Sequence, residues 1–236
     1  LRDFGKIENL QIQSKNVGDF VTNTDLKSEK ILLETLQYYY PSSTYVTEES
    51  GIIKGNHETI IIDPIDGTSN FIHGIPLIGI VISRIIDEKV TDGIIFNPIL
   101  NDFYWASLGK GAWCNDKRLR VSKRQDIQDC LIGTGIPYSN NVYNGYLEEI
   151  DNISKKCAGI RRIGAASIDL AYVASGRYDG YFQKELNIWD IAAGIILIKE
   201  AGGMLNEIDL SVNQNIKIIA SSADINAKLL EKLSNF

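Results

Sequence analysis

The sequence predicts a mixed fold, with α+β character in its first half and α/β character in its second. Residues 77–86, 90–97 and 102–106 are apolar runs separated by short turns, which is typical of antiparallel strands. After them, strand-like runs alternate with helix-like ones, which favours an α/β arrangement. The 44% hydrophobic content supplies one sizeable core, and no linker or repeat divides the chain. We therefore expect one domain over residues 1–236, with an antiparallel half (1–132) and an α/β half (133–236) sharing a cleft.

The first residues have the apolar spacing of an amphipathic helix that is entered midway. The chain starts at Leu1 rather than Met, and we expect Leu1 to Leu10 to be the end of such a helix, with a natural N-terminal segment missing. Further on, Thr24 or Asp25 can cap a helix that runs to about Tyr40, where Pro41 ends it.

The stretch IIIDPIDGTSNFIHG, residues 60–74, combines a strand with a charged turn. Its isoleucine run predicts a short buried strand, Pro64 restricts the backbone, and Gly67 permits a turn. The polar residues of 68–70 can then cap a following helix, whose N-terminus attracts anions. Asp63 and Asp66 repel each other and a phosphate alike unless a cation lies between them.

In the second half, helical patterns are expected near 142–157, 165–176, 190–201 and 223–234. Asp190 lies in the first turn of the third of these, beside Trp189 and an apolar face. That is a semi-buried place for a charge, so its carboxylate needs a partner.

Acidic residues stand out at four places in the chain. Each has a plain alternative explanation, because an aspartate can simply cap a helix and two adjacent glutamates can lie in a solvated loop. The residues concerned are Asp25, Glu48 and Glu49, Asp63 and Asp66, and Asp190. Clustered carboxylates must be paired or bound to metal, and oxygen ligands without Cys or His select a hard cation such as Mg²⁺. Several carboxylates in one cleft indicate more than one ion.

Composition narrows the classes of function. The net charge of −6 and the absence of a long basic run argue against direct nucleic-acid binding. Three widely spaced cysteines without a CxxC pattern suit the cytoplasm, and two histidines are too few for a zinc cluster. No apolar stretch reaches membrane length, and Gly109-x-Gly111 does not match a dinucleotide-binding pattern.

The chemistry that fits a metal-bound phosphate is an in-line displacement by water. Phosphatases that use an aspartate nucleophile have a D-x-D pattern, whereas here the spacing is D-x-x-D. We therefore expect attack by water, oriented by Thr68 and Asp25.

Several motifs together resemble those of the Mg²⁺-dependent, lithium-sensitive inositol monophosphatases, especially the bacterial extragenic-suppressor branch. The most specific are DPIDGT at 63–68 and WDIAAG at 189–194. The similarity continues in DFVTNTD (19–25), TEES (47–50), RRIGAASIDLAYVASGRYDGYF (161–182) and EAGG (200–203), in the family's order and over nearly the whole chain. The resemblance implies a layered αβαβα sandwich, normally dimeric, with two or three Mg²⁺ ions where the halves meet.

The resemblance also implies roles for single residues. Metal ligands would be the carboxylates of Glu48, Asp63, Asp66 and Asp190 and the backbone carbonyl of Ile65. Asp25 and Thr68 would activate water, assisted by Glu48 and Asp63, while Glu49 and Lys15 would support the metal site. Substrate contacts would come from Ile65, Asp66, Gly67, Thr68, Gly164, Ala165, Ala166, Gln183 and Asp190, with phosphate held by the amides of Gly67 and Thr68.

One position departs from the family pattern. Inositol-cleaving members carry a glutamate that touches ring hydroxyls seven residues before the WD aspartate, and this chain has Gln183 there. The segment GAAS at 164–167 also differs from the common G-[ST]-A-A pattern. We expect a phosphomonoesterase acting on inositol 1-phosphate or a related small polyol or sugar phosphate.

Other functions remain open at this point. Phosphatases of the same fold act on fructose 1,6-bisphosphate, histidinol phosphate or 3′-phosphorylated nucleotides, and Arg161 or Arg162 could reach a second phosphate, although surface arginines are more often solvated. A binding role in transcription or ribosomal-RNA processing is the alternative of another class.

Overall fold

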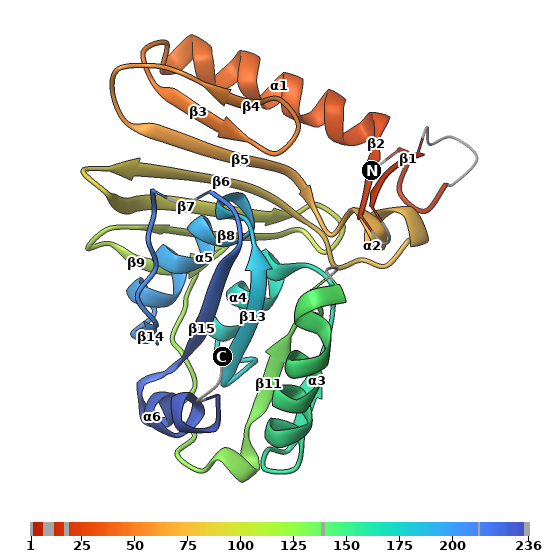
Figure 1. The fold of residues 1–236 in the computed structure, drawn as a ribbon. Helices are drawn as coiled ribbons and strands as arrows, with labels where there is room; N and C mark the ends of the chain where they lie inside the picture. The colour runs from red at the N-terminus through yellow and green to blue at the C-terminus, as the bar shows by residue number, and fades with distance from the viewer. Residues whose placement is uncertain (1, 7–11, 17–18, 138–139, 212, 234–236) are drawn as a thin grey trace.

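The computed structural model describes residues 2–6, 12–16, 19–137, 140–211 and 213–233 (Figure 1). The helices are α1 (Asn23–Tyr39), α2 (Thr68–His73), α3 (Asn140–Ser154), α4 (Ala166–Ala174), α5 (Ile188–Glu200) and α6 (Ala223–Lys232), with a 3-10 turn η2 (Ile127–Asp129). The strands up to β8 are β1 (Ile12–Asn16), β2 (Asp19–Thr22), β3 (Thr44–Thr47), β4 (Gly51–Ile53), β5 (Thr59–Asp66), β6 (Gly79–Ile86), β7 (Lys89–Asn97) and β8 (Asp102–Ser107). The later strands are β9 (Gly111–Cys114), β10 (Lys117–Arg118), β11 (Leu131–Thr134), β12 (Gly159–Arg161), β13 (Gly180–Leu186), β14 (Gly203–Leu205) and β15 (Ile216–Ser222).

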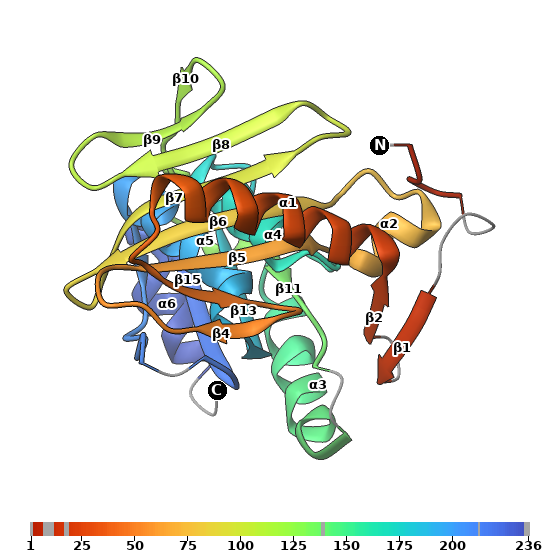
Figure 2. The same cartoon turned by 90° about the horizontal axis from the view of Figure 1, so that it is seen from above.

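These elements form five layers, in the αβαβα order that the family resemblance implies. Helix α1 lies on the outer face of an eight-stranded sheet, the pair α4 and α5 lies beneath that sheet, and a five-stranded sheet follows, with α3 and α6 on its far side (Figure 1). Viewed from above, α1 lies over β5 and runs along it (Figure 2). The fold is therefore the layered α+β sandwich that the resemblance predicts.

The eight-stranded sheet has the order β10-β9-β8-β7-β6-β5-β3-β4. All its neighbouring pairs are antiparallel except β3 and β5, which run parallel. The five-stranded sheet has the order β12-β11-β13-β15-β14, with β11 parallel to both its neighbours and the other pairs antiparallel. Both sheets are thus mixed, and the parallel β3–β5 pair is the exception to the antiparallel first half that the sequence patterns predict.

Strand β5 is buried on both faces because layers cover it above and below. Ile60 and Ile62 pack with Leu33 of α1, and Ile61 belongs to the large core around α4 and α5. The run of three isoleucines is the expected pattern for such a strand. The strand extends beyond the predicted Ile60–Ile62, through the whole DPID motif to Asp66.

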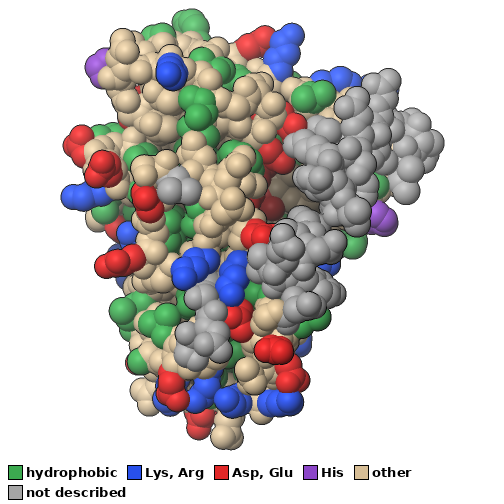
Figure 3. All heavy atoms as spheres, in the orientation of Figure 1, with side chains coloured by type: hydrophobic (Ala, Val, Ile, Leu, Met, Phe, Trp, Pro, Cys, Tyr) green, Lys and Arg blue, Asp and Glu red, His purple; other side chains and the backbone are tan. Residues whose placement is uncertain are grey.

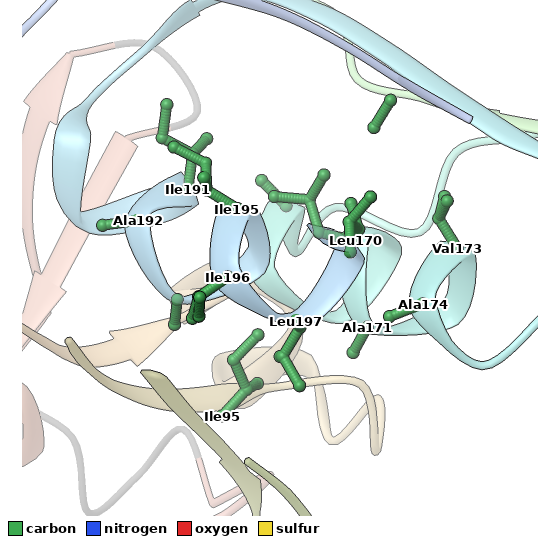
Figure 4. Close-up of a cluster of buried hydrophobic side chains, with 14 of the residues drawn as sticks. Ile95, Leu170, Ala171, Val173, Ala174, Ile191, Ala192, Ile195, Ile196 and Leu197 are labelled. Atoms are coloured by element: carbon green, nitrogen blue, oxygen red, sulfur yellow. The ribbon is translucent and has the colours of Figure 1, made fainter. Parts of the chain in front are cut away.

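The central layer is tightly packed because glycines let backbones approach closely. A Cβ on Gly93 of β7 would lie 2.9 Å from the Cα of Ala193, and one on Gly194 would clash with the side chain of Leu170 on α4. Figure 4 shows the apolar side chains that fill the space around α4 and α5. Helix α5 is therefore a rigid base for the acidic residue in its first turn.

Two expected helix caps and one expected helix end differ from the structure. The cap of α1 is Thr22, rather than Thr24 or Asp25, and the cap of α2 is Gly67, with φ 85°, rather than one of the polar residues that follow it. Residues 2–5 form turns instead of the end of a helix, and residues 1 and 7–10 lie outside the described part.

Candidate active site

A cleft of about 550 Å³ opens between the end of β5 and the start of α5. It lies where the outer sheet meets the layers beneath, and Figure 3 shows acidic side chains at a hollow between the upper and lower parts of the molecule. Of the residues singled out from the sequence, the cleft is lined by Glu48, Glu49, Asp63, Ile65, Asp66, Gly67, Thr68, Gly164, Ala165, Ala166, Gln183 and Asp190. The fold thus brings together motifs that are far apart in the sequence.

One end of the cleft, here called the carboxylate end, is formed by Asp63, Asp66 and Asp190. Each offers a carboxylate oxygen, and these oxygens all lie within 4.8 Å of one another. Strand β5 supplies the first two across a bulge, because Asp63 pairs with Val81 but Asp66 pairs with Gly79. The extra residue accommodates Pro64, which has no amide hydrogen, and changes the side-chain alternation so that both aspartates reach the cleft.

Hydrogen bonds fix these carboxylates. The amide of Ile65 donates to Oδ1 of Asp63 at 2.9 Å, and the amide of Asn187 donates to Oδ2 of Asp190 at 2.7 Å. Asp66 accepts at one oxygen from both the amide and the hydroxyl of Ser167. No arginine or lysine in the described part of the chain forms an ion pair with Asp63 or Asp66.

The electrostatics of this end favour a cation. Burial, and then the charges of Glu48, Asp66 and Asp190, raise the pKa of Asp63 well above its ordinary value. Burial likewise raises the pKa of Asp66 to about 6, although the hydrogen bonds from Ser167 oppose the shift. Burial thus favours the protonated, uncharged form of these carboxyl groups. Desolvated carboxylate oxygens in such a cluster are typical ligands of a hard divalent cation.

The TEES loop is held against this end by a residue that the sequence did not single out. Glu29 on the buried face of α1 accepts hydrogen bonds from the amides of Glu49 and Ser50, both at 2.9 Å, and from the Ser50 hydroxyl. Glu48 lies close enough to Asp63 to hydrogen-bond with it and raise its pKa. The sequence spacing could have identified Glu29, because it lies four residues after Asp25 and so on the same face of α1.

Asp25 lies behind Thr68, fully buried. Its Oδ2 accepts from the amide of Thr22 at 3.0 Å, and its Oδ1 accepts from the Thr68 hydroxyl at 3.1 Å. The Thr68 hydroxyl also lies 3.0 Å from the carbonyl oxygen of Ile65. Burial raises the pKa of Asp25. Asp25 is therefore a capping residue that also contacts the cleft residue Thr68, so its capping role does not exclude a functional one.

Asp190 likewise takes part in a helix cap and lies at the cleft. It is the third residue of α5 and accepts from the amide of the capping residue Asn187, as Asp25 does from Thr22 in α1. A capping aspartate uses one carboxylate oxygen at the helix terminus, and its carboxylate can also line a cleft.

The two halves of the chain are joined at the cleft by Asn70. Its side-chain amide donates to the carbonyl oxygens of Leu77 at 2.7 Å and Ile163 at 2.8 Å. Gly67 touches the same region, since a Cβ there would lie 3.0 Å from the Cβ of Ala165. These contacts place segment 164–166 against the DPIDGT turn, where the sequence predicts substrate contacts.

The remaining part of the cleft lining, here called the amide end, includes four residues with side-chain amides, Gln183, Asn187, Gln214 and Asn215, together with Glu185 and Arg162. The Tyr181 hydroxyl donates to Oε1 of Gln183, so that the Nε2 hydrogens remain for other partners. Glu185 has a left-handed backbone, with φ 57°, at an irregularity of β13. Arg162 is exposed and follows the last residue of β12.

Lys15 lies in β1, which pairs with β2 immediately before the cap of α1. Its side chain is outside the described part of the structure.

The comparisons with known proteins agree with this geometry. The model of the inositol monophosphatase family matches residues 2–235. The chain belongs to the inositol monophosphatase family. It is 42% identical over 241 residues to an inositol-1-monophosphatase of Caulobacter vibrioides, covering 98% of this chain and 94% of that one. It is 38% identical over 207 residues to a Nus factor SuhB of Pasteurella multocida, covering 86% and 77% of the two chains.

A solved structure gives the same result. The crystal structure of the extragenic suppressor protein suhB from Bartonella henselae superimposes with a TM-score of 0.91 at 41% identity, covering 98% of this chain and 91% of that one. Family membership supports a hydrolase of the phosphatase class with a metal site. No helix in the described part of the chain has the length and apolarity needed to cross a membrane.

Proposed function

We propose that this chain hydrolyses small phosphate monoesters, inositol 1-phosphate or a related polyol or sugar phosphate, with Mg²⁺ and water. The observation that carries the proposal is the carboxylate end, where three acidic oxygens lie within 4.8 Å beside a threonine hydroxyl that is hydrogen-bonded to a buried aspartate. Such a cluster is costly for stability, since its members repel one another and are desolvated. A functional ligand that offsets this cost explains why the fold retains it.

The donors fit Mg²⁺ because they are all oxygens. The family resemblance implies that Glu48, Asp63, Asp66, Asp190 and the carbonyl of Ile65 are ligands. We infer that Asp63, Asp66 and Asp190 would hold one ion, and Glu48, Asp63 and the Ile65 carbonyl another. Bound there, the ions supply positive charge that polarises the phosphoryl group and lowers the pKa of water. The proximity of Glu48 to Asp63 supports the second set.

Thr68 and Asp25 would act on the attacking water. The Thr68 hydroxyl donates to Oδ1 of Asp25, so its oxygen is left to accept a hydrogen bond from water in the cleft. Asp25 thereby fixes the hydroxyl in the orientation that favours removal of a proton from that water. The amides of Gly67 and Thr68, at the turn into α2, would hold the phosphate oxygens.

The amide end would bind the alcohol part of the substrate. Neutral amides bind hydroxyl groups without demanding one charge pattern, which suits a range of polyols. Gly164, Ala165 and Ala166 line the same cleft and would contact the alcohol from the second half of the chain.

A second candidate function is binding within transcription or ribosomal-RNA processing, without a need for the cleft. It is favoured by the likeness to relatives named Nus factor SuhB. The acidic cluster is not explained by that role, so it stands beside phosphatase activity rather than replacing it. Three free cysteines suit a cytoplasmic location, which remains a prediction. A homodimer also remains a prediction.

The test is phosphate release by the purified chain from a panel of inositol 1-phosphate, glycerol 2-phosphate, fructose 1,6-bisphosphate and histidinol phosphate. We expect release that is absent in EDTA, restored by millimolar Mg²⁺, lower again at higher Mg²⁺ and inhibited by Li⁺. Full activity in EDTA, or a requirement for zinc, contradicts the proposal. A sedimentation experiment on the same preparation determines whether the chain is a dimer.

A further inference from the structure

Ser167 is a buried hydroxyl at the carboxylate end that the family motifs do not explain. It lies in the first turn of α4, is fully buried, and is separated by 101 residues from Asp66. Its amide donates to Oδ2 of Asp66 at 2.7 Å, and its hydroxyl donates to the same oxygen. The sequence shows only that GAAS has its serine two places later than the common pattern.

Two donors on one oxygen determine how Asp66 presents the other. Because Oδ2 is held by Ser167, rotation of the carboxylate is restricted, and the carboxylate stays within 4.8 Å of ligand oxygens of Asp63 and Asp190. A ligand whose orientation is fixed before the metal binds loses less conformational freedom on binding.

Gly79 provides the room for this hydroxyl. It opposes Asp66 across the β5–β6 pair, next to the bulge. A Cβ at residue 79 would lie 2.5 Å from Oγ of Ser167, but 3.3 Å from Ile95 Cγ2 and 3.6 Å from Ile168 Cδ1. The Ser167 hydroxyl is therefore the neighbour that a side chain at position 79 would displace first.

We propose that Ser167 is a positioning residue that holds Asp66 in its metal-binding orientation, and that Gly79 is required because it leaves space for the Ser167 hydroxyl. The proposal rests on the proposed function, since it takes Asp66 as a metal ligand. The Ser167 amide alone would still hold Asp66 loosely, and the hydroxyl completes the alignment. The two halves of the chain would thus share one metal site through this contact.

The experiment is calorimetric titration with Mg²⁺ alone, without substrate, on the full chain. We expect Ser167→Ala to weaken Mg²⁺ binding by roughly tenfold, the usual scale for one charge-assisted hydrogen bond. Gly79→Ala should weaken Mg²⁺ binding similarly. The double variant should bind no more weakly than Ser167→Ala, because without the Ser167 hydroxyl a Cβ at residue 79 has no hydroxyl to displace.

Ser83→Ala is the matched control. Ser83 is also buried, lies on β6 as Gly79 does, and its hydroxyl makes no hydrogen bond with described residues. Its removal should leave Mg²⁺ binding unchanged, and the melting temperature of each variant in EDTA measures any general loss of stability. A structural role alone would lower that melting temperature without changing Mg²⁺ affinity.

Each outcome decides a separate claim. Wild-type affinity in Ser167→Ala overturns the positioning role, and additive losses in the double variant overturn the explanation of Gly79. If wild type and Asp63→Asn bind Mg²⁺ equally, the proposed function itself fails, whatever Ser167 does.

Discussion

The two ends of the cleft are built in different ways. At the carboxylate end, Asp63, Asp66 and Asp190 are each fixed by a hydrogen bond from a backbone amide. At the amide end, Gln183, Glu185 and Asn215 come from an irregular strand end and a loop, two of them with a left-handed backbone. From this difference we propose that the first end, which is held by hydrogen bonds and highly charged, determines the reaction, and that the second selects the alcohol.

The largest test of this contrast removes one charge from the carboxylate end. Asp63→Asn should lower turnover by at least ~10²-fold, because a metal ligand is lost. The melting temperature of the metal-free protein should stay the same or rise, since the substitution relieves repulsion from Glu48, Asp66 and Asp190. Enzyme kinetics and calorimetry in EDTA measure both effects. Near wild-type turnover at saturating Mg²⁺ would show that Asp63 is not a ligand.

A smaller effect is expected from the hydroxyl next to the cluster. Thr68→Val keeps the shape of the side chain but removes its hydrogen bond to Asp25, and should reduce kcat by roughly 10–100-fold with little change in KM. Thr35→Val is the control, because Thr35 is an exposed threonine on α1 whose hydroxyl bonds only to its own helix. Equal rates in the two variants would remove Thr68 and Asp25 from the activation of water.

Protonation gives a test that needs no substrate. Burial raises the pKa of Asp66 from 3.8 to about 6, so between these values the folded chain binds a proton that the unfolded chain has released. In the metal-free protein, protonated Asp66 therefore adds to the free energy of unfolding below pH 3.8. This contribution is lost as the pH rises through about 6. In EDTA, the melting temperature of wild type should fall between about pH 5 and 7 by at least ~2 °C more than that of Asp66→Asn. Parallel curves would mean that Asp66 titrates normally.

The smallest expected effect is at the amide end. Gln183 presents its Nε2 hydrogens because its Oε1 is engaged by Tyr181, whereas a glutamate would keep one charged acceptor for substrate hydroxyls. Gln183→Glu should improve the ratio of inositol 1-phosphate to glycerol 2-phosphate cleavage by several-fold, which corresponds to about 1–2 kcal/mol or less in relative transition-state binding. The change should appear in KM more than in kcat. Steady-state kinetics with both substrates measure this ratio. An unchanged ratio would show that residue 183 does not face the alcohol.

The same contrast explains what could be predicted from the sequence. The strand under DPIDGT follows from its apolar run, and the layered fold follows from the family resemblance that contiguous motifs carry; both are local signals. The pairing of β3 parallel to β5 and the contact of Ser167 with Asp66 depend on tertiary packing, which no local pattern records. The caps at Thr22 and Gly67 lie one to three residues from the predicted ones, because several adjacent polar residues are equally good candidates.

The most direct test of the division of labour is a steady-state comparison of wild type, Asp63→Asn and Gln183→Glu on inositol 1-phosphate and glycerol 2-phosphate. We predict that Asp63→Asn lowers kcat on both substrates by the same large factor and leaves their ratio unchanged, while Gln183→Glu changes the ratio through KM and leaves kcat nearly constant. A change of selectivity in Asp63→Asn, or an equal loss of kcat on both substrates in Gln183→Glu, would contradict the account.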